Sequence, residues 1–247
     1  MLTQKSSNDS KSKFQNKTKA KAKPKQSSLR MKLQTFPIGG IPQTRLVRLR
    51  HCQEIALNAE QNSWAQKQFW LNCPANVTGD QTPKAIGGWS TWYGMYRKAT
   101  VLDVKLQFLN TPPSSPNNSS GFQPGFMGIY VSEDSSEFAT TIANGIPNLF
   151  EQPRNVLCKS LPHAFNTQNK DCYLTKYCDV SDFFSVPTSS LYTAEDDYST
   201  TDQNPDKKIY GSVYIASVAD NDPTTVIGLV TIDMLIRFQD PRDIRAN

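Results

Sequence analysis

The chain has 247 residues, of which 37% are hydrophobic, and it carries a formal net charge of +5. This length allows one large domain or two small ones, and its Pro and Gly usage is too ordinary for a collagen-like protein. The longest almost uncharged apolar stretch, residues 224–232, is far shorter than the roughly 20 residues of a transmembrane helix, so we expect no membrane insertion.

The positive charge is concentrated at the amino terminus. Residues 1–33 hold ten Lys or Arg and one Asp, whereas the other 214 residues hold 17 bases and 21 acids. No apolar residues recur there at a helix or strand period, so burial cannot offset the entropy cost of ordering the segment. We expect a disordered basic arm and a Pro- and Gly-containing hinge over residues 1–43, without a secretory signal, followed by a folded domain over 44–247.

Residues 17–25 of the arm carry a lysine at every second position. This spacing distributes charge along an extended chain, which suits a flexible polyanion such as a nucleic acid. Phe14 is the only aromatic residue of the arm, so we expect no base stacking there. The expected phosphate contacts of the arm are Lys11, Lys13, Lys17, Lys19, Lys21, Lys23, Lys25, Arg30 and Lys32. A solubilising tail and a nuclear localisation signal are the alternative interpretations.

After the hinge, the sequence is typical of an all-β domain. Apolar and polar residues alternate in residues 47–57 and 102–108, which predicts half-buried strands. Further strands are predicted at residues 64–71, 126–132, 155–161, 173–180, 209–218 and 226–238, about eight in all. Polar loops are predicted at residues 72–88, 111–124 and 187–206, and short helices at residues 89–96 and 133–144.

Two of these segments indicate where the core lies. Trp89, Trp92, Tyr93 and Tyr96 have the spacing of one helix face, which favours a place in the core or in a subunit contact over a ligand platform. In the last predicted strand, the alternate residues from 230 to 238 are apolar, so one face of that strand is expected to be buried.

No pattern typical of catalysis or metal binding is present. The two histidines, His51 and His163, form no His-x-His pair, and the G-x-S-x-G, H-E-x-x-H and G-K-[ST] motifs are missing. The five cysteines include no CxxC pair and are expected to be free thiols. The acidic run at residues 195–197 could bind a divalent cation, but a solvated loop is favoured. We therefore expect no catalytic residues, no cofactor and no metal.

Two segments of the chain resemble a known family. RLVRLRHCQEIALN (45–58) and WSTWYGMYRKATVLDVKLQFLN (89–110) resemble the capsid proteins of small circular single-stranded DNA viruses, the circovirus-like proteins. The matching residues in the second segment are Trp89, Trp92, Tyr93, Tyr96, Val101, Val104 and Leu106. One departure is that the family's arms are often rich in arginine, whereas this arm is almost wholly lysine. The charge is kept, but the bidentate guanidinium contacts with phosphate are lost.

The resemblance implies an eight-stranded jelly-roll β-sandwich that assembles with copies of itself into a small icosahedral T=1 shell. The shell is expected to package a single-stranded genome, with DNA as the expected nucleic acid, and to act without catalysis. Arg45, Arg48 and Arg50 of the first strand are expected to line its inner surface and contact phosphates. The expected locations are the virion and, during assembly, the host nucleus or cytoplasm. The expected partners also include an unidentified host receptor, bound by outer loops.

Other interpretations stay open at this point. The chain could be a nucleic-acid-binding protein that does not assemble, such as a movement or nuclear shuttle factor. It could also be the coat protein of a satellite RNA virus, because a lysine arm does not distinguish RNA from DNA. A third alternative is a cellular ligand-binding jelly roll whose tail is irrelevant. For the three arginines of the first strand, the alternative is an ordinary solvated strand face.

Overall fold

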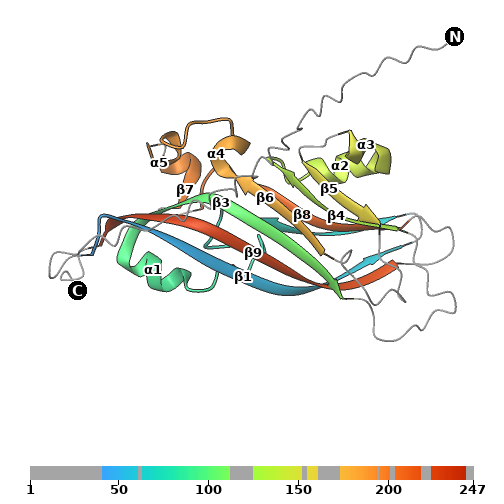
Figure 1. The fold of residues 1–247 in the computed structure, drawn as a ribbon, viewed down its shortest axis with the longest axis horizontal. Helices are drawn as coiled ribbons and strands as arrows, with labels where there is room; N and C mark the ends of the chain where they lie inside the picture. Colours follow the sequence, from blue (N-terminus) through green and yellow to red (C-terminus); the bar gives the residue numbers. More distant parts are fainter. Residues whose placement is uncertain are drawn as a thin grey trace, which may run out of the picture. The chain divides into compact units, whose positions relative to one another are not determined.

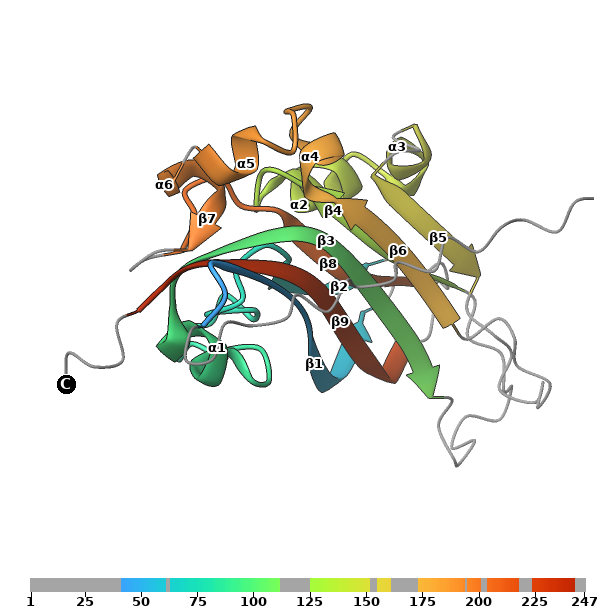
Figure 2. The same cartoon turned by 60° about the vertical axis from the view of Figure 1, so that its left-hand side comes forward.

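Two antiparallel β-sheets form the folded part of the chain (Figures 1 and 2). The computed structural model describes residues 41–60, 63–111, 125–151, 155–160, 173–193, 195–200, 204–217 and 224–242. The predicted phosphate contacts of the arm lie outside the described residues, as do His163 and most of the predicted loop 111–124. None of the described helices is long and apolar enough to cross a membrane.

The first sheet contains three long strands and two short ones. They are β1 (Thr44–Ala59), β9 (Thr224–Pro241), β3 (Tyr96–Thr111) and β6 (Tyr173–Asp179), in the order β1-β9-β3-β6, and the two-residue strand β7 (Ser199–Thr200), which also pairs with β3. The second sheet has the order β2-β8-β4-β5, with β2 (Trp64–Trp70), β8 (Tyr210–Ser217), β4 (Gly125–Ser132) and β5 (Val156–Ser160).

The strand order is that of a jelly roll. β1 pairs with β9 in one sheet, β2 pairs with β8 in the other, and β3 and β4 lie on the far sides of β9 and β8. The strands from β1 to β4 therefore alternate between the sheets, β4 and β5 form a hairpin in the second sheet, and the later strands return beside the earlier ones, which is the double Greek key of a jelly-roll sandwich. The predicted fold class is thus confirmed, and all eight predicted strands are present.

β9 lies between β1 and β3 and contributes one fully buried face. Val230, Ile232, Met234, Ile236 and Phe238 are all shielded from solvent, as their alternation predicted. The Phe238 ring packs against the aromatic rings of α1 (Trp89–Met95) and the start of β3, with ring centroids 5.8–5.9 Å from those of Trp89, Trp92 and Tyr96. The predicted aromatic cluster is therefore part of the core.

The predicted loop at residues 187–206 is wrong in part. It contains the short helices α5 (Ser190–Thr193) and α6 (Glu195–Tyr198), followed by β7. Leu191 and Tyr198 are buried among the polar residues of this segment and anchor it to the main core. The Ser199 hydroxyl donates to the Leu191 carbonyl at 3.1 Å and lies 2.6 Å from the Thr100 hydroxyl of β3. Two apolar anchors and these hydrogen bonds thus order a segment whose composition is typical of a loop.

Three further helices lie in the connections of the second half of the chain. They are α2 (Glu137–Ala143), α3 (Ile146–Phe150) and α4 (Val180–Phe183). α2 lies within the segment predicted as a short helix, and its Phe138 packs against Trp64, Tyr130 and Tyr214 in a second, smaller core. Neither α3 nor α4 was predicted.

The two faces of β3 can be distinguished by truncating a leucine on each. Leu106 is 1% exposed and Leu109 is 39% exposed on the same strand. We expect Leu106→Ala to lower the free energy of unfolding by about 2–5 kcal/mol, because it leaves a cavity in the core. Leu109→Ala is expected to cost less than about 1 kcal/mol. Equilibrium urea unfolding of the full chain measures both, and equal losses would contradict the register of β3.

Candidate nucleic-acid interface

The arginines predicted to contact phosphate begin in β1, at one edge of the first sheet. Side chains of this sheet that alternate with the buried ones point away from the core, and we call this surface the outer face. It includes Arg48, Arg50, Cys52 and Glu54 of β1, Leu229, Thr231, Asp233, Leu235 and Arg237 of β9, Asp103, Lys105, Gln107 and Leu109 of β3, and Tyr173, Thr175, Tyr177 and Asp179 of β6. Antiparallel pairing aligns these residues in rows across the four strands.

Arg50 is held by an acidic residue of the neighbouring strand. Its guanidinium makes a bidentate contact with Asp233, in which Nη2 donates to Oδ2 at 3.0 Å and Nε donates to Oδ1. The side chain of Asp233 is 6% exposed and that of Arg50 is 66% exposed. The hydrogen bond with Asp233 and its negative charge raise the pKa of Arg50. Lys105 is directly opposite Asp233 on the other side, so this carboxylate lies between two bases.

Arg48 and Arg45 lie nearer the start of β1. Arg48 pairs with Asp103 of β3 at 3.3 Å, and both side chains are substantially exposed. Arg45 is exposed too, but it is opposite Phe238, whose side chain faces the core, so Arg45 is not in the same row of side chains as Arg48 and Arg50. The structure thus brings Arg48 and Arg50 together on the outer face and leaves Arg45 at the end of the strand.

The outer face therefore has balanced charge. Its bases Arg48, Arg50, Lys105 and Arg237 equal in number its acids Glu54, Asp103, Asp179 and Asp233. A phosphate that approaches Arg48 or Arg50 must share the guanidinium with a carboxylate or displace it. Because phosphate binding depends on excess positive charge, this face offers less attraction than its arginines alone would suggest.

The carboxylates Asp103 and Asp233 were not identified as partners from the sequence. A signal was nevertheless present, because Asp233 is the one charged residue in the otherwise apolar stretch 224–236. A charge at such a position needs a partner in the folded state. Which base supplies it depends on β9 pairing with β1, and the sequence alone did not define this pairing.

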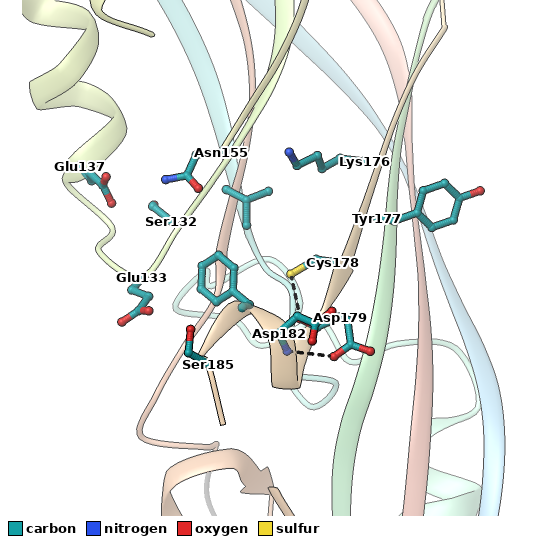
Figure 3. A pocket seen from close by; sticks show the side chains of 12 residues that line it. Ser132, Glu133, Glu137, Asn155, Lys176, Tyr177, Cys178, Asp179, Asp182 and Ser185 are labelled. Atoms are coloured by element: carbon teal, nitrogen blue, oxygen red, sulfur yellow. Dashed lines mark hydrogen bonds between the residues drawn. The ribbon is translucent and has the colours of Figure 1, made fainter. Parts of the chain in front are cut away.

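A pocket of about 720 Å³ opens between β4, β6, α2 and α4 (Figure 3). Glu133, Glu137, Asp179 and Asp182 contribute carboxylates to its lining. The ammonium group of Lys176 points toward Asn155, and partial burial lowers its pKa. The charged residues of the pocket are therefore mainly acidic, and their negative charge would repel a phosphate backbone.

The polar groups of the pocket have structural partners. Asp179 accepts hydrogen bonds from the amides of Ser181 and Asp182 and from the Ser181 hydroxyl, so it caps α4. Partial burial acts to raise the pKa of Asp179, but these hydrogen bonds outweigh it and lower the pKa. Glu137 accepts a hydrogen bond from the Tyr130 hydroxyl at 2.8 Å. Burial raises the pKa of the Cys178 thiol to about 12, which keeps it protonated and unreactive at neutral pH.

The other candidate groups from the sequence have ordinary surroundings. His51 is half-buried, with its Nε2 atom 3.4 Å from Oε1 of Gln53. In the acidic run, Asp197 lies 3.9 Å from the ammonium of Lys207. Within the described residues, no three His, Cys, Asp or Glu side chains are grouped so that they could hold a metal ion.

Several solved structures of viruses and capsid proteins are similar to this chain. Turnip yellow mosaic virus has a TM-score of 0.44 and 14% identity, covering 83% of this chain and 100% of that one. The decameric BFDV capsid protein has a TM-score of 0.40 and 10% identity, covering 80% and 99%. Desmodium yellow mottle tymovirus has a TM-score of 0.42 and 12% identity, covering 85% and 95%. No protein-family model and no curated protein matches the chain. The fold assignment rests on the chain's own strand order.

The two ion pairs of β1 are expected to differ in their contribution to stability. Arg50→Gln leaves the buried carboxylate of Asp233 without its bidentate partner and should lower the free energy of unfolding more than Arg48→Gln does. Arg48→Gln breaks an exposed pair and should cost less than about 1 kcal/mol. Urea unfolding at low ionic strength compares them, and an equal or larger loss for Arg48→Gln would contradict the contacts described for Asp233.

Proposed function

We propose that this chain is a capsid protein that assembles with copies of itself into a closed shell and retains a nucleic-acid genome through its lysine arm. The observation that carries the proposal is the separation of charge. The arm holds ten bases and one acid, whereas the outer face of the sheet is neutralised by its own carboxylates. We keep the division into an arm and hinge over residues 1–43 and a jelly-roll domain over 44–247.

The arm's chemistry suits a phosphate backbone of any base sequence. Lysine supplies a point charge without a planar fork, so the arm neutralises phosphates without reading base edges. About nine such contacts on a single strand correspond to a slope of roughly −6 when log K is plotted against log salt concentration. The same neutralisation relieves repulsion between the arms of neighbouring copies. The proposed role needs no catalytic residue, cofactor or metal.

Self-association is supported by an apolar row at one end of the first sheet. Leu109 of β3 is opposite Leu229 of β9 and Tyr173 of β6, and Ile227 follows in the next row. These side chains are 36–45% exposed. Contiguous exposed apolar residues mark protein contacts more often than solvated surface, and this favours an assembling protein over a nucleic-acid-binding module that stays monomeric.

The finer features of the proposal rest on the circovirus-like resemblance. They are a T=1 icosahedral arrangement, a single-stranded DNA genome and a place in the virion, with assembly in the host nucleus or cytoplasm. A satellite RNA virus coat protein has the same physical requirements, so the nucleic acid recovered from particles distinguishes the two.

Assembly is tested with the full chain purified at high salt and then dialysed to low salt with single-stranded DNA or RNA. We expect uniform closed particles by electron microscopy, with nuclease-resistant nucleic acid inside. A chain that stays monomeric by light scattering at every salt concentration and pH, with nucleic acid present, would contradict the proposed function.

The contribution of the arm is tested by replacing Lys17, Lys19, Lys21, Lys23 and Lys25 with glutamine. Loss of five contacts should make the salt slope for single-stranded DNA shallower by about 3.5. The matched variant with arginine at the same five positions should keep the slope of the wild type. Fluorescence anisotropy at several salt concentrations measures both, and an unchanged slope for the glutamine variant would show that the arm does not bind phosphates.

A further inference from the structure

We propose that the jelly-roll body has its own phosphate-binding site, formed by Arg97 and Arg242 at the end of the first sheet where the arm joins it. The ligand is the phosphodiester backbone of single-stranded nucleic acid. This inference rests on the proposed function and identifies the part of the body that contacts the genome. These two arginines were not among the candidates from the sequence.

Three strand ends converge at this position. The ladder between β1 and β9 begins with Thr44 opposite Gln239, and that between β3 and β9 begins with Tyr96 opposite Pro241. The amide of Asp240 donates to the Gln43 carbonyl at 3.2 Å, and the amide of Arg242 donates to the Met95 carbonyl at 2.9 Å. Arg97 and Arg242 therefore lie at the same end of the sheet as Gln43 and Thr44, which lead into β1.

Arg242 is fixed in place by the protein. Its Nε atom donates to the Tyr96 carbonyl at 3.1 Å, and its guanidinium carbon lies 5.2 Å from the centre of the Tyr93 ring. The hydrogen bond uses one of the five N–H donors of the guanidinium. An arginine that is already positioned loses less side-chain entropy when it binds a phosphate, which favours binding at this position.

Arg97 and Arg242 also differ from the arginines of the outer face in their surroundings. Both are exposed, and among the described residues neither forms an ion pair with a carboxylate. Arg48 and Arg50, by contrast, each contact an aspartate. The nearest acid in the ladder is the exposed Asp240, which lies opposite Arg97 because Tyr96 pairs with Pro241 and Lys98 with Gln239.

Other bases lie at the same end of the sheet. Arg45 is exposed at the start of β1, and its charge lowers the pKa of Tyr96 against the stronger raising effect of burial. Arg237 lies against the Tyr192 ring at 3.9 Å, and Lys98 donates to the Tyr192 carbonyl at 2.6 Å. Because Arg237 and Lys98 are both held by Tyr192 of α5, we assign the phosphate contacts to Arg97 and Arg242. The other bases add to the positive electrostatic potential at this end of the sheet.

The chemistry of the site complements that of the arm. Lysines neutralise phosphates as point charges, whereas a guanidinium can donate two parallel hydrogen bonds to one phosphate. The arm is almost wholly lysine, so the bidentate contacts it lacks are supplied by the body at its entry point. Contacts of this kind position the strand without selecting its sequence.

The test is the salt dependence of binding to a mixed-sequence single-stranded DNA, measured with the full chain at concentrations where light scattering detects no particles. R97Q/R242Q should make the slope shallower by about 1.4, and R97Q alone by about 0.7. R97K/R242K keeps the charge and should keep the slope. Urea unfolding of each variant verifies that it folds. If the R242Q substitution unfolds the chain, the single variant R97Q still tests the site, because it removes no described contact.

The matched control is R48Q/K67Q, which removes two bases that each have a carboxylate partner. Both double variants lower the net charge by two. If R48Q/K67Q changes the salt slope by less than half as much as R97Q/R242Q does, the result supports a local site at Arg97 and Arg242. Equal slopes for the two double variants would overturn the inference. A loss of heparin binding by R97Q/R242Q without any change in DNA binding would also overturn the inference, because that result indicates a polysaccharide site. If particles still form and the arm lysines still set the slope, the proposed function survives that failure.

Discussion

The pairing of β9 with both β1 and β3 is the constraint on which the rest of the molecule depends. Because side chains alternate along a strand, the register that buries Val230, Ile232 and Met234 also places Asp233 on the opposite side, between Arg50 and Lys105. A slip of one residue would turn the apolar side chains outward and move this carboxylate into the core. The packing of the core thus determines the charge balance of the outer face.

Charge that is neutralised inside the body cannot attract a polyanion strongly. Arg48 and Arg50 have the right residue type and exposure for phosphate contacts, but each already has a carboxylate partner. Arg97 and Arg242, at the end of the sheet where the ladder of β9 stops, form no ion pair with a carboxylate of the described residues. The arginines of the outer face are thus neutralised by the sheet itself, whereas residues 1–33 carry ten bases and one acid.

The sequence predicted the parts of the fold that depend on local periodicity. Alternation in residues 102–108 and 230–238 predicted the two faces of β3 and β9, and the aromatic spacing from Trp89 predicted a place in the core or in a subunit contact, of which the structure shows the core. The segment 187–206 was misassigned because only Leu191 and Tyr198 anchor an otherwise polar stretch. The partners of Arg48 and Arg50 were missed because they lie 55 and 183 residues away along the chain, and only the order of strands brings them together.

Ultraviolet cross-linking of single-stranded DNA to the full chain, mapped by mass spectrometry, locates the side chains that lie against the bases of the bound strand. Two tyrosines mark the alternatives, since Tyr93 packs beside Arg242, whereas Tyr177 is 71% exposed on the outer face beside Lys105. Cross-links in the arm and in the peptide that contains Tyr93 and Arg97, with none at Tyr177, are expected. Cross-links at Tyr177 and none near Tyr93 would mean that the outer face binds the nucleic acid despite its paired charges.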